Sequence, residues 1–322
     1  MIRYSFIIPH KNIPDLLVRC VDSIPKREDV DVVVVDDGSS CAVRNSTEFK
    51  EIADRGVNII LTDENLGAGH ARNIGLEAAA GEWVIFSDAD DHFEPGVLDS
   101  LDHYADEPYD VVFFKTQCLR ADDPHKFGER QSMCERWNRL MDDTIKGSYD
   151  SRIKLMVDCV VPWGKMIRRQ FLLDNNIRFE TVPFSNDVVW STLLLTNINK
   201  DKVCCSDSIV YNLTERSNSL SKKDTPEAFL CRSGVFMRRY HLLKDSGYAS
   251  YEDPVNYPVG FEKAKSYGPG TLIKYFRLVK SMEQCIPLEY EVEKKCHFRY
   301  PYLYFTTLLM QSIRNKELRN ER

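Results

Sequence analysis

Short apolar runs alternate with helical patterns through about the first 115 residues, and this alternation constrains the fold most. The run Val30–Val35 is almost entirely β-branched, as expected of a strand that is covered on both faces. The predicted strands are Ser5–Pro9, Val30–Val35, Val57–Leu61, Trp83–Phe86 and Asp110–Phe114, and the predicted helices are Pro14–Ile24, Phe49–Asp54 and Ala71–Ala80, with one more opened by Pro95. Repeated strand-helix units with short connections predict an α/β fold with a mainly parallel sheet, whose ligands bind beyond the carboxyl ends of the strands.

The rest of the chain has a weaker pattern. Residues 119–149 are polar and irregular, which predicts an excursion or lid. A helix is expected over Asp187–Leu195, and beyond about residue 225 helical signals dominate. We therefore expect a helical C-terminal appendage.

Composition excludes some classes of protein. The net charge of −6 over 322 residues argues against general nucleic-acid binding, which favours a basic surface. The ten cysteines include no C-x-x-C pair, which argues against a structural zinc site. The first residues show no signal-peptide pattern, and no apolar run approaches the length of a membrane span. We expect a cytoplasmic protein.

The fourth predicted strand ends in a cluster of acids. Trp83–Phe86 leads into Asp88, Asp90 and Asp91 within four residues. Unpaired charge is costly inside a strand, but at a strand's end carboxylates can hold a divalent cation through hard oxygen ligands. An acidic turn that caps the next helix is the alternative.

Two further segments could contact a ligand. Asp36 and Asp37 follow the second strand and precede a Gly-Ser turn, where an acid can accept hydrogen bonds from a base or ribose. Residues 65–75 form a glycine-containing turn that opens a helix, whose N-terminus favours anions, and Arg72 adds charged donors. A simple turn and helix cap would also explain the first segment.

These pieces together resemble the family 2 glycosyltransferases, the nucleotide-diphospho-sugar transferases. The matching sequence segments are Phe6–Pro9, Val35–Ser39, Asn65–Gly75 and Asp88–Asp91, and they follow one another in the family's order. A weaker likeness runs through residues 163–188 and points to the bacterial branch that builds capsule, exopolysaccharide or lipopolysaccharide. The resemblance implies a Rossmann-like, glycosyltransferase A-type fold. It implies a glycosyltransferase domain over 1–222, with a nucleotide-sugar half (1–117) and an acceptor half (118–222), followed by a helical region over 223–322.

The resemblance also implies a donor site for a nucleotide-diphosphate sugar, by default a UDP-sugar. Pro9 would lie at the edge of the nucleotide, Asp37 would contact the base, and Arg72 would lie near the base or diphosphate.

The acidic motif carries the rest of that site. In Asp88-Ala89-Asp90, the first acid would bind ribose and Asp90 would ligate Mg²⁺ or Mn²⁺, with Asp91 as a further acid. Such a cation stabilises the charge that develops on the leaving diphosphate.

Asp187 would be the general base that takes the proton of the acceptor hydroxyl. A single displacement would then invert the anomeric centre. The family's Glu-Asp pair is Asn186-Asp187 here, so one acid is missing. Asp187 could instead serve only to complement the helix dipole. Lys165 could contact acceptor or phosphate, and Arg216 could lie near the diphosphate; each could also be a solvated side chain.

Three functions remain open. The first is an inverting, metal-dependent glycosyltransferase that acts on a saccharide or lipid-linked acceptor. The second is a catalytically silent nucleotide-sugar-binding module, which the missing acid at Asn186 would favour. The third, a nucleotidyltransferase, ranks last because the loop Pro9–Asn12 lacks glycines. Aromatic and basic residues over 274–277 and 294–305 could contact the inner face of an anionic membrane, or form the core of the appendage.

Overall fold

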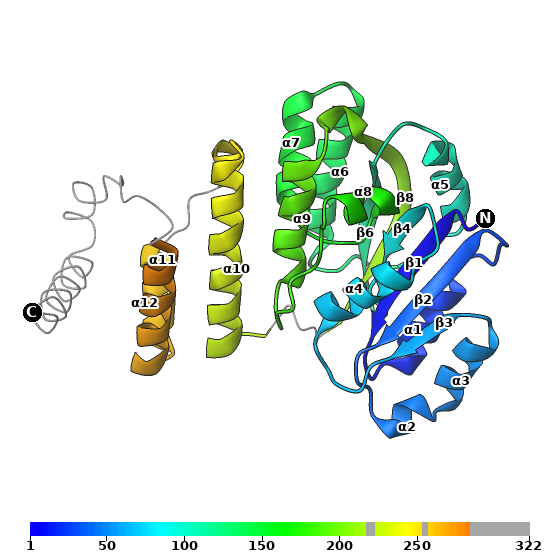
Figure 1. Cartoon of the computed structure of the whole chain (residues 1–322), viewed down its shortest axis with the longest axis horizontal. Helices are drawn as coiled ribbons and strands as arrows, with labels where there is room; N and C mark the ends of the chain where they lie inside the picture. The colour runs from blue at the N-terminus through cyan, green and yellow to red at the C-terminus, as the bar shows by residue number, and fades with distance from the viewer. Residues whose placement is uncertain (217–222, 253–256, 284–322) are drawn as a thin grey trace, which may run out of the picture. The chain divides into compact units, whose positions relative to one another are not determined.

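The computed structural model describes residues 1–216, 223–252 and 257–283. The chain divides into two compact units, Met1–Val255 and Asn256–Arg322. The first unit is built on a β-sheet covered by helices, and the described part of the second is helical, as expected (Figure 1). The domain boundary predicted at residue 222 remains a prediction.

The strands of the described residues all belong to the first unit. They are β1 (Tyr4–His10), β2 (Val30–Asp36), β3 (Asn58–Leu61), β4 (Trp83–Phe86), β5 (His92–Phe93), β6 (Val111–Arg120), β7 (Lys165–Arg168) and β8 (Val203–Glu215).

The helices lie between and after these strands. In the first unit they are α1 (Pro14–Asp22), α2 (Cys41–Arg44), α3 (Thr47–Asp54), α4 (Ala68–Ala78), α5 (Val97–Ala105), α6 (Gln131–Ile145), α7 (Tyr149–Asp158), α8 (Arg169–Asp174), α9 (Asn186–Asn197) and α10 (Pro226–Asp245), with 3-10 turns η1 (Lys200–Lys202) and η3 (Ala249–Tyr251). In the second unit they are α11 (Tyr257–Ser266) and α12 (Pro269–Glu283).

The strands of the described residues form one eight-stranded sheet in the order β3-β2-β1-β4-β7-β6-β8-β5. β1 pairs in parallel with β2 and β4, β2 with β3, and β6 with β8. β7 runs antiparallel to β4 and β6, and β5 runs antiparallel to β8. The predicted α/β fold with a mainly parallel sheet is therefore confirmed, with β7 joining two parallel groups.

The β2 strand is covered on both faces, as its β-branched run predicts. Val33 and Val35 pack with Ala71 of α4 on one face. Val34 belongs to the main core on the other face, together with Leu17 of α1. Side chains alternate along a strand, so a continuous apolar run supplies both faces.

Helix α4 approaches the sheet closely at Gly75. A Cβ atom added there would lie 2.3 Å from Cγ2 of Ile7 and 3.5 Å from Cγ2 of Val35. The helix can pack at this distance only because residue 75 has no side chain. This close packing holds α4 against β1 and β2, and so fixes the position of the glycine-containing turn that opens the helix.

Residues 119–149 are not the irregular excursion or lid that their polar composition predicts, because they include a long packed helix. Much of this stretch is helix α6, and its Cys134, Trp137 and Met141 side chains are buried. The Trp137 ring lies 5.8 Å from that of Trp163, centroid to centroid. The apolar positions recur at helical spacing, but the polar residues between them obscure the pattern.

Strand β8 is longer than the sequence pattern predicts. The pattern indicates a strand only over Ile209–Tyr211, whereas β8 spans thirteen residues. Its register with β6 shifts on either side of Lys115, and such a bulge interrupts the alternation of inward and outward residues. β8 brings Tyr211 and Thr214 to the acidic turn after β4.

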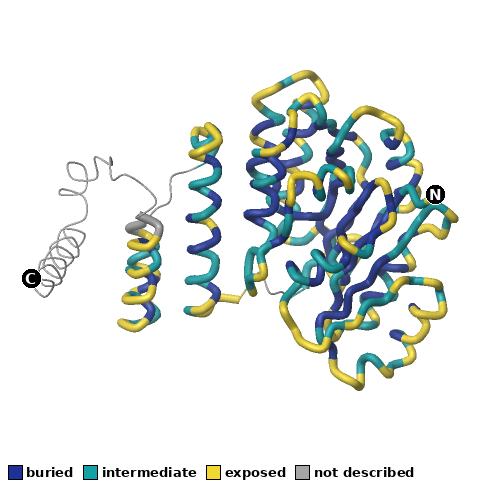
Figure 2. Tube along the Cα trace, viewed as in Figure 1, coloured by how far each residue is buried: buried dark blue, intermediate teal, exposed yellow. Residues whose placement is uncertain are grey.

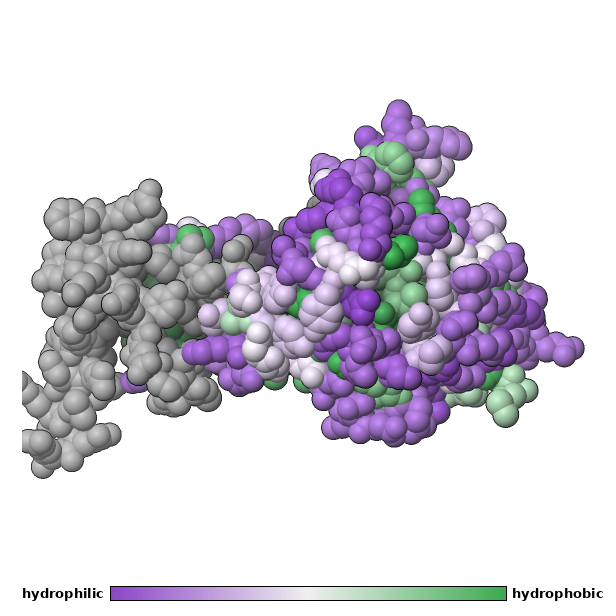
Figure 3. All heavy atoms as spheres, turned by 90° about the horizontal axis from the view of Figure 1, so that it is seen from above, coloured by the Kyte–Doolittle hydropathy of each residue, from purple (hydrophilic) through white to green (hydrophobic). Residues whose placement is uncertain are grey.

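Burial follows this layered arrangement. Figure 2 shows buried residues concentrated in the strands and on the inward sides of the helices, with exposed residues mainly in the connections. The face seen in Figure 3 is mostly hydrophilic, with hydrophobic residues in small groups. Among the described residues, no helix is both long and apolar enough to span a membrane.

Candidate functional site

The carboxyl ends of β1, β2 and β4 meet at one edge of the sheet. The parallel register pairs Ile7 with Phe86, and His10 with Asp36. The segments that follow β2 and β4 therefore begin at the same edge, where ligands bind in open parallel sheets. The two acidic motifs predicted from the sequence lie in these segments.

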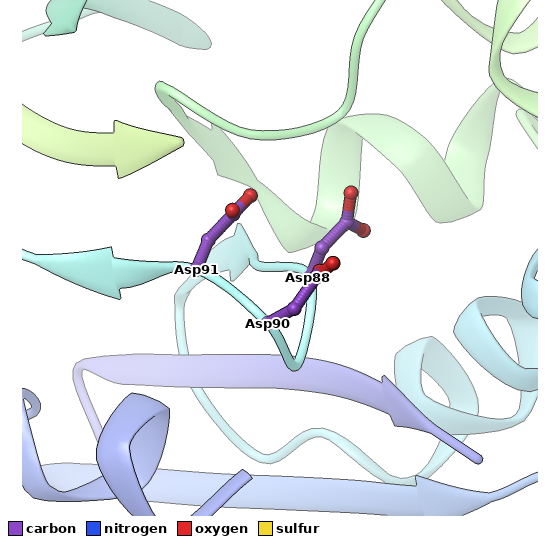
Figure 4. Close-up of side chains that lie close together, drawn as sticks. All are labelled: Asp88, Asp90 and Asp91. Atoms are coloured by element: carbon purple, nitrogen blue, oxygen red, sulfur yellow. The ribbon is translucent and has the colours of Figure 1, made fainter. Parts of the chain in front are cut away.

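Three carboxylates gather in the turn after β4 (Figure 4). One ligand atom from each of Asp88, Asp90 and Asp91 lies within 4.8 Å of the others. Burial, together with the charge of Asp88, raises the pKa of Asp90 above its ordinary value. A divalent cation would relieve this repulsion, and Mg²⁺ and Mn²⁺ prefer oxygen ligands. The donor set therefore fits the predicted cation.

Asp91 is held by the protein through both of its oxygens. The Tyr211 hydroxyl donates to Oδ2 and the backbone N–H of Thr214 donates to Oδ1, each at 2.7 Å. The N–H of Asp88 in turn donates to the Tyr211 hydroxyl at 2.9 Å. Burial and the charges of its two neighbours raise the pKa of Asp91 well above its ordinary value. Asp91 thus shapes the turn, and Asp88 and Asp90 are the better placed to hold a cation.

Arg216 lies within this acidic site. Its guanidinium forms an ion pair with the Asp90 carboxylate, whose side chain is 22% exposed. Arg19 donates to the backbone carbonyl of Asp90 and, at 2.9 Å, to the hydroxyl of Thr214. Arg216 therefore offsets the charge of the carboxylate that the cation would use.

Asp37 holds the turn that opens α4. Its two carboxylate oxygens accept from the backbone N–H groups of Leu66 at 2.9 Å and Gly67 at 2.8 Å, and the residue is 3% exposed. Pro9 pairs in register with Val35 one strand away. Both residues lie at the predicted edge, and the contact of Asp37 with a base stays a prediction.

A buried cluster lies beneath this turn. The N–H of Ile13 donates to Nε2 of His10, so Nδ1 carries the proton and donates to Asp36 at 2.9 Å. The same carboxylate accepts from the N–H of Ser39 and from Nε of Arg44. Burial opposes ionisation, but these hydrogen bonds hold the pKa of Asp36 below its ordinary value.

Arg72 connects the acidic turn to helix α9. Its Nη2 donates to the Asp88 carboxylate at 2.5 Å, and its Nη1 donates to the amide oxygen of Asn186 at 2.9 Å. The guanidinium carbon lies 5.3 Å from the centroid of the Phe179 ring. Arg72 thus joins residues that are far apart in the sequence.

Asp187 is the second residue of α9 and is half-buried. Burial raises the pKa of its carboxyl group above the ordinary value, and the charge of Asp88 adds to this effect. The charges of Arg72 and Lys165 act in the opposite direction. The charges of Asp88, Arg72 and Lys165 therefore all act on the Asp187 carboxyl group.

Lys165 is buried and is used by the protein itself. Its Nζ lies 3.2 Å from the carbonyl of Cys159 and 2.5 Å from that of Val161, and also contacts the Cys159 thiol. It lies 5.0 Å from the centroid of the Phe113 ring. Burial lowers the pKa of Lys165. Its contact with an acceptor or phosphate stays a prediction.

Sequence reasoning missed the residues that support the turn. Tyr211 and Thr214 lie on β8, and Arg19 lies on α1, where polar side chains on regular elements give no local signal of function. Tyr211 ends the short apolar run Ile209–Tyr211, which indicates a strand but not a role for the hydroxyl.

Comparison with known proteins supports the predicted family. Residues 5–174 match the family model described as glycosyl transferase family 2. The succinoglycan biosynthesis protein ExoO of Rhizobium meliloti (strain 1021) is 29% identical over 251 residues, covering 74% of this chain and 69% of that protein. Glycosyltransferase GlyA of Streptococcus pneumoniae serotype 4 is 22% identical, covering 98% of this chain and 47% of that protein. The chain thus spans about half the length of GlyA.

A solved structure supports the fold. The crystal structure of S. aureus TarS 1-349 in complex with UDP-GlcNAc matches with a TM-score of 0.64 at 22% identity, covering 89% of this chain and 82% of that chain. This likeness confirms the predicted glycosyltransferase A-type fold. Because the family model also covers more than half of the 322 residues, the chain belongs to glycosyl transferase family 2.

Proposed function

We propose that this chain is an inverting, metal-dependent glycosyltransferase. It moves a sugar from a nucleotide-diphosphate donor to a hydroxyl of a saccharide or lipid-linked acceptor. The observation that carries the proposal is the Arg72 bridge, which ties Asp88 of the donor-side turn to Asn186, the neighbour of Asp187. Family membership supports the reaction class.

The donor and the pathway are proposed from the relatives. TarS, which shares the fold, was solved with UDP-GlcNAc, so UDP is the nucleotide we propose first. ExoO is named for succinoglycan biosynthesis, which favours a role in the synthesis of a bacterial surface polysaccharide.

The acidic turn would bind the donor's diphosphate. Asp90 and Asp88 would hold the Mg²⁺ or Mn²⁺ ion, which when bound supplies positive charge to the leaving diphosphate. Arg72 adds a second positive charge on a rigid fork of donors, a geometry that suits phosphate oxygens. Asp91 and Tyr211 keep the turn in shape through their hydrogen bonds.

Asp187 would activate the acceptor. A hydroxyl is a poor nucleophile, and a carboxylate that accepts its proton during attack lowers the barrier. A carboxyl group whose pKa is raised by burial is a stronger base than an exposed one, provided that it is ionised at the working pH. One displacement from the face opposite the leaving group inverts the anomeric configuration.

The test is the substitution Asp187→Asn. It preserves shape but removes the base, so UDP-sugar binding should persist while transfer falls by about 100-fold or more. Asp201→Asn is the matched control, because the Asp201 side chain is 90% exposed and follows the same helix. Transfer at the wild-type rate by Asp187→Asn, or a product that keeps the donor's configuration, would refute the mechanism.

The catalytically silent module is the second candidate, because Asn186 stands where the family has an acid. It predicts that the wild-type protein binds UDP-sugars but transfers nothing to any acceptor saccharide. The same assay on wild-type protein therefore separates the two functions.

We also propose that the reaction takes place in the cytoplasm, at the inner face of the membrane. In α12, Lys274 and Arg277 are exposed, whereas Tyr275 is buried against Phe261 at 5.0 Å between centroids. The second basic and aromatic segment, residues 294–305, lies outside the described residues. We expect the protein to bind anionic vesicles at low salt and not to bind neutral vesicles. Failure to bind the anionic vesicles would count against membrane contact.

A further inference from the structure

Helix α10 packs near the start of α9, the helix that carries Asp187. Val188 and Val189 of α9 cluster with Val235 of α10, and all three side chains are buried. The match to the family model ends at residue 174, before either helix begins. What α10 contributes to the site therefore has to be inferred from its own contacts.

The segment that leads into α9 is fixed to α4 at its beginning. The Asn73 amide donates to the carbonyl of Phe179 and accepts from the N–H of the same residue, each at 2.9 Å. The Glu180 carbonyl packs on Gly69, where an added Cβ atom would lie 2.4 Å from the carbonyl oxygen. The Phe179 ring stacks on that of Trp190 of α9, with 4.4 Å between centroids and 8° between planes. The segment therefore starts from a fixed position beside the donor-side helix.

Helix α10 holds the same segment through side chains. Arg238 donates from Nε to Oε1 of Glu180 at 2.8 Å and from Nη2 to Oε2 at 3.0 Å, so the two side chains form a fork. The Arg232 guanidinium carbon lies 5.2 Å from the centroid of the Phe184 ring. The Cys231 thiol donates to the Phe184 carbonyl at 3.6 Å. Three positions of α10 thus contact the two ends of the segment 180–184.

A strained turn joins this segment to Asp187. Ser185 has a left-handed backbone with φ of 56°, and its carbonyl accepts from the N–H of Val188 at 3.3 Å. A residue with a side chain keeps such a conformation only where the surrounding structure holds it. Asp187 lies two positions further on, in the first turn of α9. The place of its carboxylate therefore depends on how firmly the preceding segment is held.

We infer that Arg238 of α10 is a positioning residue for Asp187, which acts through its fork with Glu180. The inference rests on the proposed function, because it takes Asp187 as the base that meets the acceptor. A base must lie within hydrogen-bond reach of the hydroxyl, and a displacement of about 1 Å can cost about 100-fold in rate. A partly exposed ion pair contributes little to overall stability, so its loss should lower the rate of transfer more than it lowers stability.

Single substitutions test each side of the fork. Glu180→Gln and Arg238→Gln each remove one charge and weaken the pair. We expect either variant to bind UDP in the presence of Mn²⁺ within about twofold of the wild-type affinity, and to transfer sugar about fivefold more slowly or worse per UDP-binding site. The stoichiometry of the UDP titration counts the folded sites, so a loss of folded protein cannot imitate a loss of rate.

A charge reversal separates the pair from its members. The double variant Glu180→Arg with Arg238→Glu restores an ion pair with opposite polarity, and we expect it to transfer sugar faster than either single variant. Asp29→Asn is the matched control, because Asp29 accepts a similar fork from Arg27. The exposed fractions of those side chains are 30% and 34%, against 23% and 37% for Glu180 and Arg238. Asp29 precedes β2 at its amino end, away from the site, so this variant should transfer at the wild-type rate.

Each outcome decides between the two proposals. If the wild type transfers sugar and both single variants match its rate per site, this inference is wrong and the proposed function stands. If Asp29→Asn loses as much rate as they do, or the double variant transfers no faster than they do, the fork does not position Asp187 and the inference is also wrong. If the wild type transfers no sugar, the proposed function fails, and this inference fails with it.

Discussion

The hydroxyl of Tyr211 should contribute more to stability than a single buried hydrogen bond. It donates to the Asp91 carboxylate at 2.7 Å and accepts from the N–H of Asp88 at 2.9 Å, and the residue is fully buried. Tyr211→Phe removes this atom but keeps the ring, which stacks on Trp163 at 5.3 Å and 8°. The variant therefore isolates the hydroxyl from the packing.

The expected loss of unfolding free energy follows from the two groups that lose a hydrogen-bond partner, the Asp91 carboxylate and the N–H of Asp88. Loss of a hydrogen bond to a charged group costs about 1.5–3 kcal/mol, and an unpaired buried N–H costs about 1–3 kcal/mol. The two losses share one atom and are not fully additive, so we expect about 3 kcal/mol of lost unfolding free energy. If the unfolding free energy falls by about 3 kcal/mol per molar urea, the urea concentration at the midpoint of unfolding should fall by roughly 1 M.

Tryptophan fluorescence suits this assay. The protein's four tryptophans all lie in the first unit, so their signal follows the unfolding of the unit that holds the site: Trp83, Trp137, Trp163 and Trp190. Tyr149→Phe is the control, because Tyr149 is 55% exposed and should change stability by less than about 0.5 kcal/mol. A loss below about 0.5 kcal/mol in Tyr211→Phe would refute the role given to its hydroxyl.

Three further predictions concern packing and ionisation. Gly75→Val should lose about 3 kcal/mol of stability in the same urea assay, because its Cβ would lie 2.3 Å from Cγ2 of Ile7; a near-neutral change would contradict the packing of α4. The pKa of Asp36 is lower in the folded protein than in the unfolded chain. The ionised carboxylate therefore stabilises the fold above about pH 4, and this contribution is lost as the pH falls further. Urea unfolding across this range should show a weaker dependence on pH for Asp36→Asn than for the wild type, and parallel curves would disprove this linkage. Because the pKa of Asp187 is raised, the acid limb of kcat/KM should have its midpoint above the ordinary aspartate value of about 3.9, and a midpoint at or below that value would argue against Asp187 as the base.

The strands that carry the donor motifs could be predicted because their signals are local. The β-branched run predicts strand β2, and the abrupt change from Phe86 to Asp88 predicts where strand β4 ends. Parallel strands then bring those ends to one edge by geometry alone. The predicted family, fold and acidic cluster follow from these features.

The supporting contacts could not be predicted because they depend on tertiary packing. Arg72 and Asn186 are 114 positions apart, and Tyr211 lies 120 positions from Asp91. Antiparallel β7 and the bulged β8 give weak patterns, yet β8 determines which side chains support the acidic turn. Helix α6 was likewise not predicted, because only a narrow face of it is buried and polar residues fill the positions between the buried ones.

We propose above all that the turn after β4 binds a nucleotide-diphosphate donor through a cation held by Asp90. The decisive experiment is calorimetric titration of the wild type with a panel of nucleoside diphosphates and their sugars, with and without Mn²⁺. We expect one nucleotide to bind in the presence of Mn²⁺, and we expect Asp90→Ala to abolish this binding. Binding that needs no metal, or that survives in Asp90→Ala, would show that Asp90 does not hold a cation for the donor.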